Sequence, residues 1–467
     1  DIQEGLRDDL TLLLMSATLA SDQIKATLPN AKLLSSKGRS FPITYAYSPA
    51  NNVRFWREHA LNVIKQQLDN LASSVLVFLP SSSDIKWLAL QLKPYLPEHV
   101  TVFSLFGDLP LNEQQQAILP CAAGKHKIVL ATNIAETSLT IEGVNLVIDA
   151  GLEKVAVFDE QTLSNQLQQQ MTCKASAIQR AGRAGRLEAG HCIRLFGEDN
   201  FQRRPEQAIS SIQQTDLVPV LIEAARWGVD ALNKLPMLEL PNQKKEQQAW
   251  QTLNQLMIVD DKFKLTSHGE RVAKLSCHPR FAHMIIKSQE IALLDGYFDS
   301  LTRLACLITA LLEERDIFAA EQARDNADIA LRISVLIDGV QNKKRQSGKH
   351  FRIIQQAQQL LKQINYRGKM SFSESLPAEH CGLLLALAFA PERIAKARNN
   401  QGDYLAANGK GMSLSIDDAL AAQPYIVIAN AGLYRQKLSV RLAAAVNFDE
   451  LMDLNLVKID TESVPEY

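Results

Sequence analysis

Two arginines and a glutamine lie close together in one short segment, and their side chains suit a triphosphate. The segment reads Gln179-Arg180-Ala181-Gly182-Arg183-Ala184-Gly185-Arg186. On an α-helix, at about 100° per residue, Gln179, Arg183 and Arg186 share one face and Arg180 points elsewhere. A guanidinium offers a planar fork of donors to phosphate oxygens, and an arginine at a γ-phosphate stabilises transition-state charge. We therefore predict that these three side chains act on a nucleoside triphosphate.

Two glycines, Gly182 and Gly185, stand between the arginines. Each weakens a helix by about 1 kcal/mol relative to alanine. That cost is tolerable where a large group must approach the backbone, so the glycines predict close approach of the triphosphate. The alternative, a solvated basic helix with acidic partners, is typical of an arbitrary set of charges but not of this glycine spacing.

Strand and helix patterns alternate on both sides of this segment, from about residue 43 to residue 196. Alternation predicts a parallel sheet covered by helices on both faces, with ligands at the carboxyl ends of its strands. Ser81, Thr132 and the segment after Gly151 fall near such ends. The expected strands are 74–79, 100–105, 127–131, 145–149 and 190–196, and the expected helices are 82–95 and 112–118.

Three further segments surround or interrupt this alternation. Near the start, residues 12–15 and 32–34 are short apolar runs that predict strands, separated by a helix over 22–28. Residues 151–174 break the pattern, and we expect 155–158 and 166–172 to pair as a hairpin. After residue 204 the pattern is mainly helical, and from about residue 388 short strands separated by turns predict a small barrel.

The composition is that of a folded and nearly neutral chain. Its 467 residues suggest about three or four domains, and the formal net charge is −1. Because nucleic-acid binders are often strongly basic, any RNA site must be a local channel of positive charge and backbone donors. The six cysteines are scattered without a CxxC pair, which predicts free thiols in a reducing cytoplasm and no zinc site. The sequence has no unbroken apolar run of about 18 residues, so we expect no membrane span.

The motifs of this chain resemble those of the DEAH/RHA-type superfamily 2 RNA helicases. The resemblance rests on blocks in the family's order: 16–18 (Ser-Ala-Thr, motif III), 77–80 (motif IV), 105–110, 131–143 (Ala-Thr-Asn-Ile-Ala-Glu-Thr-Ser-Leu-Thr-Ile-Glu-Gly, motif V) and 179–186 (motif VI). Motifs V and VI are specific, whereas three small residues alone are weak. Blocks at 216–228, 278–280, 390–395 and 404–411 further resemble the bacterial HrpB type.

The resemblance implies an α/β RecA-like parallel-sheet domain followed by winged-helix, helical ratchet-like and OB-like small β-barrel domains. We predict the end of a first RecA-like domain with its linker at 1–41 and the second RecA-like domain at 42–205. The remaining boundaries are 206–275 for the winged helix, 276–375 for the helical domain and 376–467 for an incomplete OB-like domain.

The resemblance also assigns the ATP side of the site. Gln179 would position the attacking water, and Arg183 and Arg186 would be the arginine fingers. Ser16 and Thr18 in motif III would couple the nucleotide state to domain closure.

On the RNA side, the resemblance places phosphates against motif V. Thr132 and Asn133 would hold the phosphates, and Thr137 and Ser138 would support that loop. A strand-end loop rich in hydroxyl, amide and backbone N–H groups suits such contacts. Simple helix capping is the alternative for Thr137 and Ser138.

Most of the remaining assignments have an alternative that the sequence leaves open. Asp149 follows an apolar strand and would contact a nucleotide ribose, or else cap a loop. Arg393 and Lys410 in the OB-like segment would contact the RNA backbone, or else be ordinary surface charge. Glu136 is assigned a structural role, because a carboxylate beside phosphates would repel them. The hairpin at 154–172 would lie near the point of strand separation, or else be an edge hairpin without a ligand.

Two motifs of the family are missing from the sequence. It contains no GxxxxGK[ST] loop and no Asp-Glu-Ala-His box, which in the family precede motif III and hold the phosphates and Mg²⁺. We therefore expect the chain to be part of an ATP-dependent RNA helicase that moves 3′ to 5′ and to be inactive alone. The partners would be RNA and ATP with Mg²⁺, in the cytoplasm and without a membrane. A non-catalytic RNA-binding or regulatory module and a DNA helicase are the alternatives.

Overall fold

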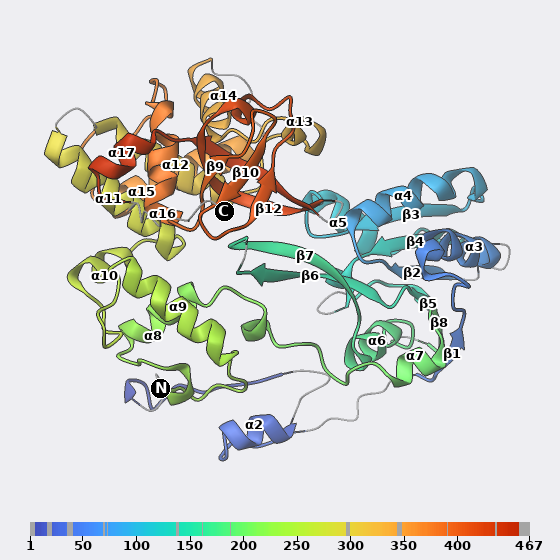
Figure 1. Cartoon of the computed structure of the whole chain (residues 1–467). Helices are drawn as coiled ribbons and strands as arrows, with labels where there is room; N and C mark the ends of the chain where they lie inside the picture. Colours follow the sequence, from blue (N-terminus) through green and yellow to red (C-terminus); the bar gives the residue numbers. More distant parts are fainter. Residues whose placement is uncertain are drawn as a thin grey trace, which may run out of the picture. The chain divides into compact units, whose positions relative to one another are not determined.

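The computed structural model describes most of the chain, in two units defined by their internal contacts (Figure 1). Unit 1 comprises Asp1–Val157 with Asn165–Thr215, and unit 2 comprises Phe158–Ser164 with Asp216–Tyr467. The described residues are 5–15, 21–34, 41–68, 71, 73–136, 140–160, 162–186, 188–295, 299–342, 348–389, 391–434 and 437–456.

Unit 1 contains a six-stranded sheet in the order β1-β8-β5-β2-β4-β3, in which every neighbouring pair is parallel. The predicted parallel α/β sheet is therefore confirmed. Its strands are β1 Ile43–Tyr47, β2 Ser74–Phe78, β3 Val100–Leu105, β4 His126–Ala131, β5 Val144–Asp149 and β8 Gly190–Arg194. Its helices are α3 Trp56–Leu68, α4 Ser82–Leu92, α5 Leu111–Ile118, α6 Lys174–Ala181 and α7 Glu198–Gln202.

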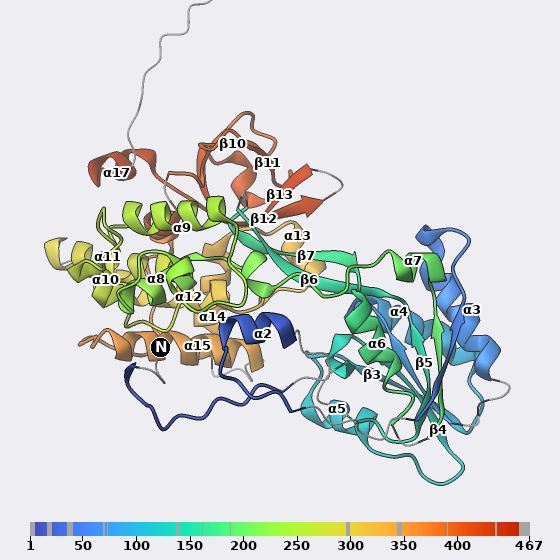
Figure 2. The same cartoon turned by 90° about the horizontal axis from the view of Figure 1, so that it is seen from below.

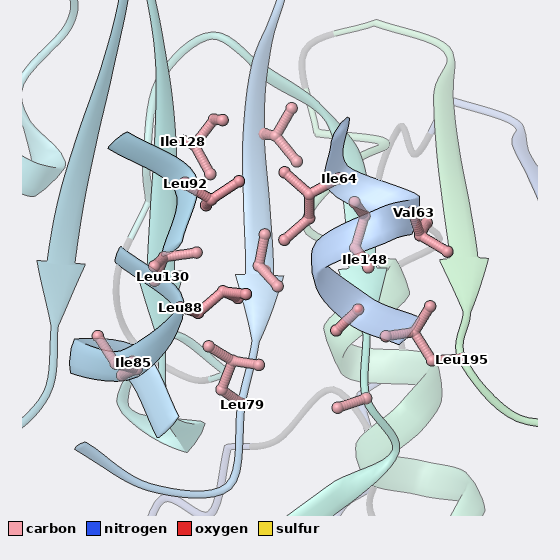
Figure 3. Packing of buried hydrophobic residues seen from close by; sticks show 14 of the residues in the cluster. Val63, Ile64, Leu79, Ile85, Leu88, Leu92, Ile128, Leu130, Ile148 and Leu195 are labelled. Atoms are coloured by element: carbon pink, nitrogen blue, oxygen red, sulfur yellow. The ribbon is translucent and has the colours of Figure 1, made fainter. Parts of the chain in front are cut away.

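Apolar side chains on both faces of the strands hold the sheet between its helices. The central strand β2 is buried along its whole length. On one face, Val63 and Ile64 of α3 and Leu88 of α4 pack against Ile128 and Ile148 of the sheet (Figure 3). On the other face, the helix α6 contributes to a second buried cluster that contains side chains of β2, β4 and β5. This double covering explains why the strands appear in the sequence as nearly continuous apolar runs.

The two strands predicted near the start of the chain are absent. Residues 11–15 and 31–34 have no strand conformation, whereas the helix between them is present as α2 Ser21–Thr27. The side chains of Leu13 and Leu34 are 76% and 90% exposed. A parallel strand forms only where a neighbouring strand receives its N–H and C=O groups. Among the described residues no strand pairs with these segments, so an apolar run alone did not suffice.

The predicted hairpin is present and stands apart from the main sheet. The strands β6 Leu152–Asp159 and β7 Ser164–Met171 form a two-stranded sheet, and both views show them side by side (Figures 1 and 2). The tip of the hairpin belongs to unit 2. There the Ser164 hydroxyl donates to the Ala431 carbonyl at 3.3 Å, and the Lys245 ammonium lies 3.6 Å from the Glu160 carboxylate.

The rest of unit 2 consists of helices and a closed barrel. The helices are α8 Val218–Arg226, α9 Gln243–Gln255, α10 Ser267–Val272, α11 Pro279–Asp295, α12 Asp299–Glu313, α13 Ala320–Arg324, α14 Ile329–Gln341, α15 Gly348–Gln363, α16 Cys381–Phe389 and α17 Phe448–Asp453. Between α9 and α10, Val259 and Leu265 form an isolated antiparallel bridge. The helix α16 is buried at every residue and contacts α11 and α12 as well as the barrel strands β12 and β13.

The predicted small barrel is confirmed as a closed five-stranded barrel in the order β10-β11-β13-β12-β9. Its strands are β9 Ile394–Ala397, β10 Asp403–Ala406, β11 Gly411–Ser413, β12 Tyr425–Tyr434 and β13 Lys437–Ala445. Tyr404 fills the interior, and its hydroxyl lies within hydrogen-bond distance of the carbonyls of Leu420 and Gln423, at 2.5 and 2.7 Å. The bounds predicted for the winged-helix, helical and OB-like domains remain predictions.

No helix in the described part of the chain combines the length and the apolar character of a membrane span. The same residues contain no group of three or more His, Cys, Asp or Glu side chains placed to bind a metal ion. All six cysteines are free thiols.

A buried histidine, His283, predicts that unit 2 loses stability in acid. His283 on α11 is buried, and its Nδ1 lies 2.9 Å from Nε2 of His268. Burial, and then the neighbouring His268, lowers the pKa of His283 from 6.5 to about 3. Between these values the unfolded chain binds a proton that the folded chain does not. Stability is therefore lost as the pH falls from about 6.5 toward 3, by at most about 1.4 kcal/mol per pH unit.

Urea unfolding of unit 2 between pH 7.5 and 4.5 measures this slope. His283→Gln keeps a polar side chain without the titration, so its free energy of unfolding should depend less steeply on pH. Substitution of the exposed His191 in unit 1 by glutamine is the control and should leave the slope unchanged. An equally steep slope in His283→Gln would exclude this histidine as the source.

Candidate functional site

The loop after β4 begins at the carboxyl end of the sheet. The Thr132 N–H donates to the Leu105 carbonyl at 3.1 Å, so the loop leaves the sheet beside the end of β3. A 3₁₀ turn, Asn133–Ala135, follows directly. The Thr132 side chain is half-buried and the Asn133 side chain is exposed. A hydroxyl and an amide therefore stand at a strand end, and their contact with RNA phosphates stays a prediction.

The helix that carries the glutamine and arginines is shorter than predicted. The helix α6 ends at Ala181, and residues 182–185 form turns, with the Arg183 N–H donating to the Arg180 carbonyl at 3.1 Å. The prediction of one helix through residue 186 is therefore wrong. Gly182 and Gly185 weaken any continuation of the helix. In addition, the Phe41 N–H donates to the Gly185 carbonyl at 3.1 Å, which binds this turn to the start of β1.

Gly185 serves packing rather than ligand approach. A Cβ at Gly185 would lie 2.8 Å from the Phe41 carbonyl oxygen and 2.9 Å from the side chain of Ile43. The space left by the missing side chain is thus filled by the chain itself. The interpretation that Gly185 opens a face for the triphosphate is wrong.

Arg183 and Arg186 nevertheless converge on the loop after β4. The Arg183 guanidinium donates to the Glu136 carbonyl, and Nη1 of Arg186 lies 2.5 Å from the Thr140 hydroxyl oxygen. Arg183 is half-buried, Arg186 is exposed, and Gln179 is half-buried in the last turn of α6. The structure therefore places two of the predicted catalytic side chains against the loop that begins with Thr132.

These two arginines form a positive centre. Burial, and then the neighbouring charge of Arg186, lowers the pKa of Arg183 to about 10, while Glu136 partly opposes the shift. With this pKa, the Arg183 guanidinium remains charged at neutral pH. Two like charges held close together are stabilised by an anion that lies between or beside them. The pair is therefore suited to phosphate oxygens.

Arg180, which the sequence places away from the face of Gln179, Arg183 and Arg186, is buried and makes structural contacts. Its side chain is 1% exposed, and its Nε donates to the Glu136 carboxylate at 3.0 Å. Its Nη1 donates to the Asp149 carboxylate at 3.0 Å and to the Leu152 carbonyl at 3.1 Å. The structural role assigned to Glu136 fits this ion pair.

Asp149 is not available to a nucleotide ribose. Its side chain is fully buried, and Oδ1 accepts from the Gly151 N–H at 2.8 Å as well as from Arg180. The alternative role, a cap of the loop after β5, is what the structure shows. The prediction of a ribose contact is wrong, because a carboxylate inside the sheet cannot reach a ligand at its surface.

Arg393 is likewise not available to RNA. Its side chain is fully buried near Phe389, with the guanidinium carbon 5.8 Å from the ring centre. Burial, and then the nearby Arg280, lowers the pKa of Arg393 to about 10. The predicted backbone contact is wrong, because a fully buried side chain cannot reach an RNA backbone. Lys410, in the turn between β10 and β11, is half-buried and stays a prediction.

Four predicted residues lie outside the part of the chain that the structure describes. These are Ser16, Thr18, Thr137 and Ser138.

Sequence reasoning missed Arg204, which closes the base of the hairpin. Its side chain is buried, and Nη1 donates to the carbonyls of Gly151 and Thr172 at 3.0 and 3.1 Å. These partners are 53 and 32 residues away in the chain. No local pattern in the sequence indicates contacts of that kind.

The chain is similar to known helicases over nearly its whole length. A family profile described as "Helicase conserved C-terminal domain" matches residues 59–188. "ATP-dependent RNA helicase HrpB" of Escherichia coli is 36% identical over 454 residues, which cover 97% of this chain and 52% of that protein. "Probable ATP-dependent RNA helicase DHR2" of Saccharomyces cerevisiae is 31% identical, over 67% of this chain and 44% of that protein.

A solved structure agrees in fold. The "Crystal structure of E. coli DExH-box NTPase HrpB" superposes with a TM-score of 0.80 at 35% identity, and covers 97% of this chain and 52% of that chain. The chain thus spans about half the length of the HrpB sequence and structure that it matches.

Proposed function

Since the chain belongs to the DEAH/RHA helicases of the HrpB type, we propose that it forms the arginine-finger half of an ATP-driven RNA helicase. The full-length protein would hydrolyse ATP between two RecA-like domains and move along single-stranded RNA from 3′ to 5′. Unit 1 would be the second of those domains. The observation that carries this proposal is the convergence of Arg183 and Arg186 on the loop after β4.

In this proposal, Arg183 and Arg186 bind the transferred γ-phosphoryl group. Charge spreads over its oxygens in the transition state, and two fixed guanidiniums stabilise that charge more than they stabilise the ground state. Gln179, four residues before Arg183 in the chain, would orient the attacking water. Ser16 and Thr18 would couple the nucleotide state to closure of the two domains.

The same loop would carry the RNA. Thr132 and Asn133 begin it and would hold backbone phosphates, with Thr137 and Ser138 supporting them; Lys410 would add a contact in unit 2. Glu136 precedes Thr137 in that loop, and its carbonyl accepts from Arg183. Phosphate contacts fix position without reading sequence, which suits a motor that moves along any RNA.

Mg²⁺ does not fit the residues of this chain that the structure describes, since they hold no cluster of carboxylates or histidines for it. We propose that its ligands and the phosphate-binding loop lie in the other RecA-like domain of the full-length protein, as in the family. This chain would then contribute charge and orientation, and no step here depends on the metal.

The test compares ATP turnover by the purified chain with turnover by the full-length protein. We expect no RNA-stimulated turnover by the chain, because it lacks a GxxxxGK[ST] loop. The full-length protein should hydrolyse ATP faster with single-stranded RNA than with a DNA strand of the same sequence.

Three outcomes would contradict the proposal. RNA-stimulated turnover by the chain alone would show a complete ATP site within it. Equal stimulation by DNA would favour a DNA helicase. A full-length protein that binds RNA but never hydrolyses ATP would be a non-catalytic RNA-binding module.

A further inference from the structure

Among the described strands, the hairpin β6–β7 has no partner in the main sheet, so within unit 1 its direction depends on the residues at its base. The six-stranded sheet and the hairpin are separate sheets. The hairpin enters after Gly151 and leaves at Thr172, whose N–H donates to the Gly151 carbonyl at 3.0 Å. These two residues are therefore the point from which the hairpin projects.

The entry point is tightly packed. Gly151 has φ +66°, a conformation that favours glycine, and a Cβ there would lie 2.3 Å from the Phe196 ring and 2.6 Å from Nη2 of Arg204. Arg204 itself lies over the Phe196 ring at 3.7 Å and donates to the Thr172 hydroxyl at 2.6 Å. One buried guanidinium thus holds both ends of the hairpin.

A second buried guanidinium, that of Arg180, connects the first strand of the hairpin to Glu136 in the loop after β4. Arg180 of α6 donates to the Leu152 carbonyl at the start of β6 and lies 3.9 Å from the Glu153 carboxylate. It also pairs with Glu136 and Asp149. These two carboxylates raise the pKa of Arg180 although burial, the largest single effect, opposes them. The charge of Arg180 therefore compensates carboxylates from three separate segments.

Glu136 connects this arrangement to the proposed fingers. Its carboxylate accepts from Arg180, and its backbone carbonyl accepts from Arg183. A movement of Arg183 toward a phosphate would therefore also displace Glu136, to which Arg180 donates a hydrogen bond. At the other end of the hairpin, Thr162 and Ser164 are buried within unit 2.

We propose that Arg180 is a positioning residue that links the loop after β4 to the base of the hairpin. Arg204 completes this arrangement, which we call the base clamp. The clamp, made of Arg180 and Arg204, would set the direction of the hairpin according to the position of Glu136. The expected consequence is that the clamp couples ATP turnover to RNA unwinding, and this consequence rests on the proposed function. The clamp itself is a property of unit 1 and can be tested without activity.

The first test is hydrogen exchange of the chain. Arg180→Lys keeps the charge but loses the planar fork that reaches Glu136, Asp149 and Leu152 together. We expect amides of β6 and β7 to exchange at least tenfold faster in Arg180→Lys and Arg204→Lys. The matched control is Arg194→Lys. Arg194 is also buried in unit 1, but it stacks on Phe201 at 3.9 Å and donates to the Tyr47 hydroxyl at 2.9 Å.

Unchanged exchange of the hairpin in Arg180→Lys would overturn the clamp, and so would equal acceleration in Arg194→Lys. Glu136→Gln is a milder variant that keeps an acceptor for Arg180 and removes one charge. It should give a smaller acceleration, confined to β6 and the loop after β4. Faster exchange throughout unit 1 in every variant would indicate general destabilisation and would also count against the clamp.

The second test measures base pairs unwound per ATP hydrolysed by the full-length protein. We expect Arg180→Lys to lower this ratio about tenfold while RNA-free ATP turnover stays within about threefold. Arg194→Lys should leave the ratio unchanged. Equal losses of turnover and unwinding in Arg180→Lys would overturn the coupling role. Absence of any turnover in the wild-type protein would refute the proposed function, while the exchange experiment still decides the clamp.

Discussion

Arg186→Ala in the full-length protein is expected to lower ATP turnover by about 10³–10⁵-fold, the range that removal of an arginine finger produces. The side chain of Arg186 is exposed, and its one described contact is with the exposed Thr140. The substitution therefore removes a charge at the phosphate without opening a buried cavity. The affinity for RNA should stay within a few-fold of the wild-type value, because the proposed RNA contacts are made by other residues, beginning with Thr132.

Steady-state kinetics with saturating RNA measures the effect as kcat. Arg203→Ala removes another exposed arginine of unit 1 and should leave kcat unchanged. Arg183→Ala is less informative, because Arg183 is half-buried and also holds the Glu136 carbonyl. If kcat of Arg186→Ala stays within a few-fold of wild type, Arg186 is not a finger.

Gly382→Ala is expected to destabilise unit 2 by about 3 kcal/mol or more, at the upper end of what overpacking costs. Gly382 lies in α16, where every residue is buried. An added Cβ would lie 2.0 Å from the Ala445 carbonyl oxygen and 2.8 Å from the Val446 Cβ. The nearest obstacle is backbone, which cannot rotate away as a side chain can. Either α16 or the end of β13 must shift.

Urea unfolding of the chain measures the loss as a lower midpoint of the unit 2 transition. Gly339→Ala in α14 is the matched control, because a Cβ there would have no atom within 4 Å. It should leave the free energy of unfolding unchanged or raise it by up to about 1 kcal/mol, since alanine favours a helix. Equal midpoints for the two variants would mean that α16 packs more loosely than described.

The sheet of unit 1 could be predicted because its signal is local. The expected strand 100–105 is β3, and the expected strands at 127–131 and 145–149 each begin one residue after β4 and β5 begin. Buried parallel strands are short apolar runs, and such a run is visible without knowledge of its neighbours. The same signal wrongly predicted a strand at 12–15, where no described strand is available to pair.

The site could be predicted only in part. Motif order and residue types pointed to Gln179, Arg183 and Arg186, and the structure brings the two arginines to the loop after β4. The assumed continuous helix was nevertheless wrong. An interaction between Gly185 and Phe41, more than a hundred residues apart, ends it, and no local propensity reports such a contact.

The sequence by itself determined the family, the alternation of strands and helices, and which side chains carry charge. Only the tertiary structure decided which charges face solvent. Arg180 and Arg186 are the same residue type six positions apart, yet one is buried among carboxylates and the other is exposed. Likewise, the side chains of Asp149 and Arg393, which the sequence assigned to ligand contacts, are buried. The reason is physical: the burial of a charge depends on partners that are distant in the chain and meet it only after the sheet and barrel have formed.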